Sequence, residues 1–175
     1  MPIPTASQPF LDGLQKEIGF VPNLAAAMAE SPTLIESFTT VRRILAHSAF
    51  TPLERETISL AVSFENDCSY CMAAHSTFAK MQGASDATLD ALRVGDTPAD
   101  ARLGALAAYT RDLIANRGHA TEEAKGAMLR AGFTPSQLLE VIAVLAFTTI
   151  ANYAHNITEC AIDQVFQPQL WRKSA

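Results

Sequence analysis

The sequence predicts an all-α, single-domain helical bundle of about six to eight helices, and three observations support this fold class. Apolar residues recur at intervals of three and four positions, as at Leu34, Phe38 and Val41, which is the spacing of one helix face. Ser-Pro and Thr-Pro pairs mark several helix starts. No segment alternates convincingly between apolar and polar residues with the period of two that a half-buried strand requires.

Hydroxyl–proline pairs predict helix N-termini along the chain. The hydroxyl accepts an otherwise unpaired backbone N–H, and proline at the first helical position has no N–H to lose. The four pairs are Ser31-Pro32, Thr51-Pro52, Thr97-Pro98 and Thr134-Pro135, and the last three have a capping-box partner at Glu54, Asp100 and Gln137. Thr121, which precedes two glutamates, predicts a further start. Helix ends are predicted at the glycines that follow periodic runs, namely Gly83, Gly118 and Gly132.

The two ends of the chain differ from its middle. The first thirty residues read as short pieces interrupted by proline, whereas the segment 136–166 is apolar on nearly all sides and predicts a central helix. We therefore expect one domain over residues 1–175, with its core at about residues 19–166 and a loose tail after Pro168.

The composition narrows the functional classes. Hydrophobic residues make up 49% of the 175 positions and charged residues only 18%, against about 25% charged in a typical soluble domain. The chain is too apolar to be disordered. Its net charge of −5 and its lack of a basic cluster argue against nucleic acid as a partner. The shortage of charge predicts that another copy of the chain covers part of the surface.

Neither a membrane span nor a secretory leader is expected. The longest strongly apolar run, Val141–Phe147, is far short of the roughly 20 residues that cross a bilayer. Residues 1–4 lack a positively charged and an apolar region, so we expect a cytoplasmic protein. Three cysteines, Cys68, Cys71 and Cys160, do not form a disulfide framework. In a reducing compartment a close cysteine pair is typical of a catalytic or metal-binding site.

The candidate chemistry lies in residues 51–83. A helix is expected from Thr51 to about Phe64, with a break at Asn66-Asp67 and Asp67 as the N-cap of the next helix. Cys68 and Cys71 then fall in the first turn, where unpaired N–H groups and the helix dipole favour thiolates. The side chain of His75, four residues after Cys71, lies on the same helix face.

Glu56 extends this group of residues. If the two helices pack as an antiparallel pair, Glu56 comes level with the turn that contains His75, and the apolar residues around it bury its position. A carboxylate against an imidazole fixes its tautomer and raises its basicity. The sequence therefore suggests a proton relay from Glu56 through His75 to a cysteine.

These residues and their spacing resemble a known family. Glu56, Cys68-Ser69-Tyr70-Cys71 and His75 are similar to the motif of the AhpD-like alkylhydroperoxidases, a group within the carboxymuconolactone decarboxylase superfamily. The clear similarity covers residues 51–83, and a weaker one reaches from Gly19 to Phe166. It includes the segments Gly19–Asn23, Ser31-Pro32 and Asn152-Tyr153.

The resemblance implies an AhpD-like helical fold, a homo-oligomer (a trimer or a hexamer) and an antioxidant thiol peroxidase or disulfide reductase. It implies that Cys71 attacks the hydroperoxide, that Cys68 resolves the product as a disulfide, and that Glu56 and His75 relay protons. One departure is Tyr70, which stands where the best-studied members have histidine, so the phenol becomes a possible wall or proton donor of the pocket. The late helix has His155-Asn156 in place of a common Asn-His pair, and no role is transferred there.

Simpler interpretations remain beside this one. The cysteine pair could be half of a zinc site with His75 and either Cys160 or His155, or two inert buried thiols. His75 could be a core histidine and Glu56 a solvated charge, while Cys160 is interpreted as core. Asn152, His155 and Glu159 form a polar stripe that is more typical of a solvated or interfacial face.

The main prediction is a peroxidase without a bound cofactor or metal, reduced by an external protein or dithiol, since no glycine-rich cofactor loop occurs. The alternatives are a lactone decarboxylase of the same superfamily and a redox-sensing oligomer without enzymatic activity.

Overall fold

The computed structural model describes residues 3–173, and within that range the chain forms helices and no strand. The predicted all-α fold is therefore confirmed, although the chain divides more finely than into six to eight helices. Nine α-helices and two 3-10 helices occupy the described residues. They are η1 Thr5–Ser7, α1 Gln8–Ile18, α2 Asn23–Met28, α3 Pro32–Leu45, α4 Pro52–Glu65, α5 Ser69–Met81, α6 Asp86–Arg93, α7 Ala101–Ala115, α8 Glu122–Arg130, α9 Pro135–Thr158 and η2 Gln164–Gln169.

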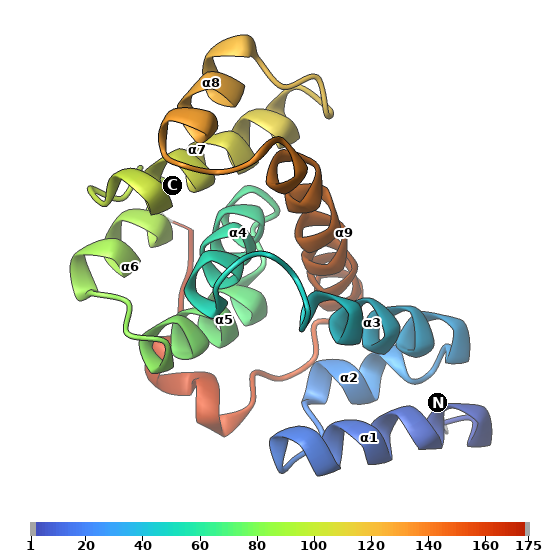
Figure 1. Cartoon of the computed structure of the whole chain (residues 1–175). Helices are drawn as coiled ribbons and strands as arrows, with labels where there is room; N and C mark the ends of the chain where they lie inside the picture. The colour runs from blue at the N-terminus through green and yellow to red at the C-terminus, as the bar shows by residue number, and fades with distance from the viewer. Residues whose placement is uncertain (1–2, 174–175) are drawn as a thin grey trace.

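Helix α4 is the centre of the bundle. It packs on α5, α7 and α9, and these are the most extensive interhelical contacts in the described chain. Helices α1–α3 form a layer on the other side of α9 from α7 and α8, and α6 lies beside the α4–α5 pair (Figure 1). Because α9 contacts α2 and α3 as well as α4 and α5, it joins the N-terminal layer to the rest of the molecule.

Most predicted helix boundaries are present. Thr51 and Thr134 each form both hydrogen bonds of a capping box, and Ser31 and Thr121 each accept one N–H at their helix start. The start predicted at Thr97-Pro98 is wrong. Helix α7 begins at Ala101 because the carboxylate of Asp100 accepts the N–H groups of two residues after it, so Asp100 acts as the N-cap itself. Gly83, Gly118 and Gly132 all have positive φ after helix ends, as expected.

The turn between α4 and α5 differs from the prediction by one residue. Asp67 is not the N-cap, because it adopts the left-handed conformation with φ of 50°. Cys68 takes the cap position, and its sulfur accepts the backbone N–H of Cys71 at 3.3 Å. The Cys68 sulfur therefore accepts the hydrogen bond of an N-cap, the role that the sequence predicted for Asp67.

The C-terminal tail is ordered as far as the structure describes it, so the expectation of a loose tail after Pro168 is wrong. Trp171 is buried, its indole N–H donates to the carbonyl of Arg93 at 2.7 Å, and its ring packs edge-on against Phe64. The guanidinium of Arg93 in turn donates to the carbonyls of Gln169 and Leu170. A large aromatic ring with one polar group stabilises a chain end when both parts find partners.

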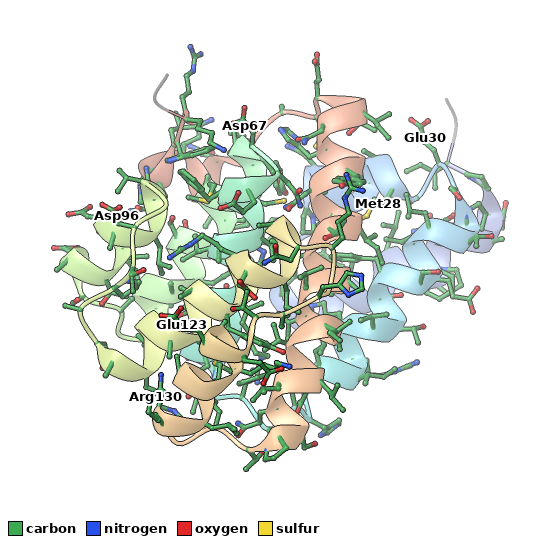
Figure 2. All side chains as sticks on the ribbon, turned by 90° about the horizontal axis from the view of Figure 1, so that it is seen from above. Met28, Glu30, Asp67, Asp96, Glu123 and Arg130 are labelled. Carbon is green, nitrogen blue, oxygen red and sulfur yellow. The ribbon has the colours of Figure 1, made fainter. Side chains whose placement is uncertain are left out.

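Helix α9 is long and apolar enough to cross a membrane by length and composition alone. It ends at Thr158, earlier than the segment 136–166 that the sequence predicted as a central helix. The core helix of a soluble protein has the same character, and α9 packs on α2, α3, α4, α5 and α8. Figure 2 shows Asp96 and Arg130 at the periphery of the bundle, whereas Met28 lies between the N-terminal helices and α9. We therefore interpret α9 as a core helix.

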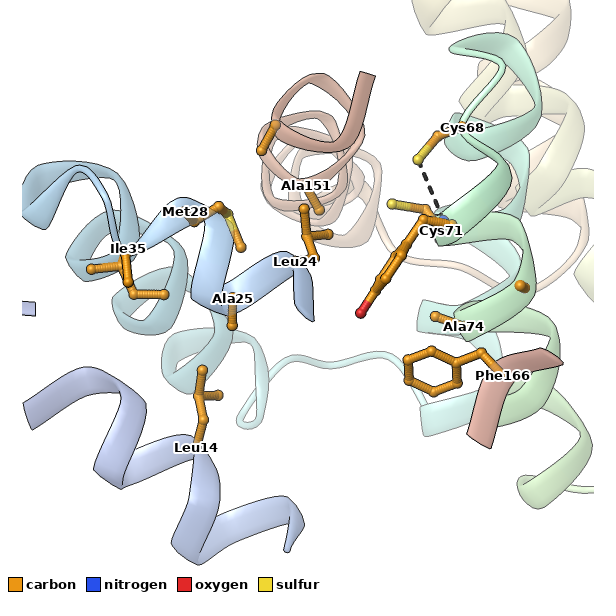
Figure 3. Close-up of a cluster of buried hydrophobic side chains, with 14 of the residues drawn as sticks. Leu14, Leu24, Ala25, Met28, Ile35, Cys68, Cys71, Ala74, Ala151 and Phe166 are labelled. Atoms are coloured by element: carbon orange, nitrogen blue, oxygen red, sulfur yellow. Dashed lines mark hydrogen bonds between the residues drawn. The ribbon is translucent and has the colours of Figure 1, made fainter. Parts of the chain in front are cut away.

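One hydrophobic cluster of the bundle surrounds the cysteine pair. It brings together residues of α1, α2, α3, α5 and α9, and Phe166 of η2 closes it. Figure 3 shows Leu24, Ala25 and Met28 on one side and Cys71, Ala74 and Phe166 on the other. The candidate cysteines therefore lie where the N-terminal layer meets the α4–α5 pair.

Candidate active site

Glu56 and His75 meet as the antiparallel arrangement of α4 and α5 predicted. The Nδ1 atom of His75 lies 2.7 Å from Oε2 of Glu56. Both side chains are largely buried, with exposed fractions of 13% for His75 and 19% for Glu56. An ionised carboxylate only accepts hydrogen bonds, so Nδ1 carries the proton and Nε2 is left with a free lone pair. The pair can therefore accept a proton at Nε2 and return it.

Cys68 and Cys71 are free thiols at the start of α5, and both are buried. The two cysteines lie three residues apart at the first turn of α5. Figure 3 shows the hydrogen bond that the Cys71 amide donates to the Cys68 sulfur. Only Cys71 lines the neighbouring cavity, whereas Cys68 lies behind it. A substrate in the cavity therefore meets Cys71 first.

Hydrogen bonding and burial move the pKa values of the two thiols in opposite directions. The hydrogen bond from the Cys71 side chain, together with bonds from the Cys71 amide and Asn152, lowers the pKa of Cys68 although burial opposes it. Burial, and the bond that it donates to Cys68, raise the pKa of Cys71 well above its ordinary value. Cys68 is therefore the more acidic of the two thiols.

A cavity of about 630 Å³ opens onto this group. Its walls come from α1, α2, α3, α4, α5, α9 and η2, and Glu56, Cys71 and His75 all line it. The volume is in the range of small-molecule sites. The interior is mainly apolar, with side chains such as Met28, Phe38 and Phe147. The arrangement suits a reaction between a thiol and an organic molecule, shielded from bulk water.

Tyr70 is a wall of the cavity with a fixed hydroxyl. It lines the cavity and donates a hydrogen bond of 2.5 Å to Asp163, whose carboxylate also accepts the N–H of Asn23 at the start of α2. Burial and this bond raise the pKa of Tyr70, so the phenol stays protonated. Because its proton is committed to Asp163, Tyr70 does not replace the missing histidine as a free proton donor.

Asn152 and His155 on α9 face inward, so the solvated stripe that the sequence favoured is wrong for these two residues. Asn152 is fully buried and donates to the hydroxyl of Ser63 at 3.2 Å. His155 is buried beside Tyr70, and its Nδ1 lies 3.5 Å from the sulfur of Cys160. Cys160 is only half-buried and packs against the cluster around the cysteine pair.

The zinc interpretation of the cysteine pair finds no support in the described chain. Within residues 3–173, no three His, Cys, Asp or Glu side chains gather in a way that could hold a metal ion.

Comparison with known proteins supports the fold and the superfamily. Residues 32–112 match the carboxymuconolactone decarboxylase family. No curated protein matches the sequence. Among solved structures, an uncharacterized peroxidase-related protein from Silicibacter sp. TM1040 has 24% identity and a TM-score of 0.79, over 97% of this chain and 91% of its own. A protein from Ralstonia eutropha JMP134, described as an alkylhydroperoxidase AhpD core and an uncharacterized peroxidase-related protein, has 24% identity and a TM-score of 0.81, over 95% and 93% of the two chains.

A third relative in structure has a different reaction. The debrominase Bmp8, solved with 2,3,4-tribromopyrrole, has 17% identity and a TM-score of 0.75, over 94% of this chain and 89% of its own. At these identities the neighbours establish the fold and leave the reaction open. Residues 32–112 therefore match the carboxymuconolactone decarboxylase family, and the chain as a whole has an AhpD-like fold.

Sequence reasoning identified the residues at the reacting end of the cavity but missed several others. Asp163, which fixes Tyr70, lies 93 positions away from it in the sequence, and no local pattern connects the two. Asn152 was noticed only in a polar stripe and in a segment of the family resemblance, with no role at the cysteines. Arg43 and Arg55 also line the cavity. The position of Arg55 next to Glu56 on a short helix was the one signal that could have indicated it.

Proposed function

We propose that the chain is a thiol-dependent oxidoreductase that reduces organic hydroperoxides through a Cys68–Cys71 dithiol/disulfide cycle. The observation that supports this most directly is a single apolar cavity. It exposes Cys71 beside the Glu56–His75 pair, with the sulfur of Cys68 on the amide of Cys71. The helical start lowers the cost of a thiolate there.

The first step forms a sulfenic acid. The Nε2 lone pair of His75, held by Glu56, takes the proton of Cys71, and the Cys71 thiolate attacks the terminal oxygen of the hydroperoxide. The O–O bond breaks, and the alkoxide leaves as an alcohol with the same proton, which His75 returns to it. The peroxide is reduced to an alcohol, and Cys71 is oxidised to the S–OH state. General acid assistance of this kind contributes about 10²–10⁴-fold to a rate.

The second step closes the disulfide. The Cys68 thiol attacks the sulfur of Cys71, and its proton leaves with the hydroxyl group of the sulfenic acid as water. Two residues three apart at a helix start can form this bond with modest rearrangement of the first turn. An external dithiol or protein then returns two electrons by thiol–disulfide exchange. We propose no bound cofactor, because the cysteine pair itself stores both electrons.

Intact-mass measurement tests the cycle directly. One equivalent of cumene hydroperoxide added to the reduced protein is expected to remove two hydrogens, located by peptide mapping to Cys68 and Cys71. Two unreacted thiols would contradict the proposal. Cys71→Ser is expected to abolish peroxide consumption, whereas Cys68→Ser should let Cys71 oxidise further to the sulfinic state. Cys160→Ser serves as the matched control and should cycle normally.

The same variants separate the alternatives. A lactone decarboxylase would keep its activity in the Cys68→Ser/Cys71→Ser double variant. A redox-sensing oligomer would form the disulfide and change its sedimentation without turning over peroxide when several reductants are supplied.

A further inference from the structure

The charged residues that line the cavity do not balance one another. Glu17 forms an ion pair with Arg42, and Glu56 is bound to His75. Arg43 and Arg55 also line the cavity, and no carboxylate among residues 3–173 pairs with either of them. In a chain with a net charge of −5, the cavity therefore has a local excess of positive charge. Such a site attracts anions.

Arg55 is held in place without a counter-ion. One of its guanidinium nitrogens donates to the carbonyl of Phe50 at 2.7 Å and to the hydroxyl of Ser48 at 3.2 Å. A guanidinium has five N–H donors, so most remain for a ligand. Arg43 is exposed in the last turn of α3, where the helix dipole stabilises a positive charge. This interaction with the helix dipole does not require Arg43 to line a cavity.

The rest of the cavity is suited to a flexible hydrocarbon. Leu24 and Met28 of α2, Phe38 of α3, Phe147 of α9 and Phe166 of η2 contribute its apolar walls. With about 630 Å³ of space, it is larger than a small peroxide such as hydrogen peroxide requires. An apolar cavity with unpaired cations in its lining matches a molecule with a long apolar body and one anionic head.

We propose that the cavity binds aliphatic carboxylates, with the chain along the apolar walls and the carboxylate at Arg43 and Arg55. A hydroperoxide derived from such an acid would then be the substrate at Cys71, and this second part rests on the proposed function. The binding of the acid itself does not, because it involves no chemistry at the cysteines.

Titration calorimetry on the reduced full-length protein compares octanoate with 1-octanol and octylammonium, three probes of equal chain length. Octanoate is expected to bind at least about tenfold more tightly than 1-octanol, and octylammonium more weakly still. Raising the salt concentration should reduce the advantage of octanoate alone. Longer acids should bind more tightly, with a limit of about fourfold per added methylene. Equal binding of octanoate and 1-octanol would overturn the proposal.

Variants assign the head group to its partners. Arg43→Gln and Arg55→Gln are each expected to lower the affinity for octanoate by about three- to tenfold and to leave the affinity for 1-octanol unchanged. Arg43→Lys should keep most of the affinity because it keeps the charge. Arg130→Gln, an exposed arginine on α8 outside the cavity, is the matched control and should bind octanoate normally. Full octanoate affinity in Arg43→Gln and Arg55→Gln would contradict the assignment.

The two proposals can fail separately. If octanoate shows no preference but cumene hydroperoxide still oxidises Cys68 and Cys71, only the carboxylate proposal is wrong. If octanoate binds through the arginines but no peroxide forms the disulfide, the binding site stands and the peroxidase proposal is wrong.

Discussion

The two cysteines of one helical turn differ in access to the cavity and in the direction of their pKa shifts. Hydrogen bonds lower the pKa of Cys68, yet this side chain is fully buried behind its neighbour. Burial raises the pKa of Cys71, yet this is the thiol that lines the cavity. In the proposed cycle, Cys71 therefore meets the substrate, and Cys68 closes the disulfide afterwards.

Glu56 acts through His75, and its amide variant tests this positioning role. Glu56→Gln is expected to lower peroxide turnover by about 10- to 100-fold and to change the shape of the pH–rate profile, with helical content unchanged. The amide cannot hold the imidazole in one tautomer as the carboxylate does. Glu65→Gln, an exposed acid on the same helix, is the control. An unchanged profile together with a reduced rate would assign Glu56 a merely structural role.

The segment 159–163 after α9 connects three helices at the scale of elements. Ala161 and Asp163 accept hydrogen bonds from Asn23 at the start of α2, and Asp163 accepts the hydroxyl of Tyr70 on α5. His155, in the last turn of α9, lies between this segment and Ser69 of α5, with its Nε2 3.4 Å from the Ser69 hydroxyl. The segment therefore holds the N-terminal layer against the start of the cysteine helix.

Acid is expected to loosen this junction through His155. Burial lowers its pKa, so below about pH 6.5 the unfolded chain binds a proton that the folded chain does not. Stability is thus present above that pH and falls as the pH decreases. Thermal unfolding should show a larger loss of Tm from pH 7.5 to 5.5 in the wild type than in His155→Gln. His47→Gln, which changes an exposed histidine, should behave like the wild type, and an equal loss in His155→Gln would contradict the assignment.

One face of α9 remains uncovered in the whole molecule. Leu139, Ile142, Tyr153 and Ile157 have exposed fractions of 70%, 50%, 56% and 83%, and their spacing places them on the same side of the helix. A continuous apolar stripe of this kind is typical of an interface. We propose that a second copy of the chain covers it, within a trimer or a hexamer, which also accounts for the low charge content of the sequence.

Sedimentation velocity tests the assembly. The wild type at micromolar concentration is expected to sediment with an apparent mass well above the 18.8 kDa of one chain. Leu139→Glu/Ile157→Glu should shift it toward the monomer, because charges in an apolar interface are costly to desolvate. Leu129→Glu, at an exposed position on α8, is the matched control. A monomeric wild type would show that α9 is simply an exposed face.

Local signals determined much of the fold and half of the site. The sequence predicts features that depend on residues within about four positions of one another. These are the capping at Thr51 and Thr134, the helix ends at glycines and the helical periodicity. The meeting of Glu56 and His75 also followed, because a short turn between two helices leaves little choice but an antiparallel pair. Even here the sequence placed the cap at Asp67, since a sulfur as cap is hard to anticipate.

Contacts between distant segments decided the rest. Trp171 becomes buried only because α6 offers a carbonyl and α4 offers Phe64. Asp163 and Asn152 reach the cysteine helix only after α9 packs against it, and Arg43 and Arg55 share a cavity only because α3 and α4 both face it. The sequence by itself determined the helices and the reactive motif, because these depend on neighbours along the chain. The tertiary structure decided which thiol a substrate can reach and which charges surround it, because access and pairing depend on how the helices pack.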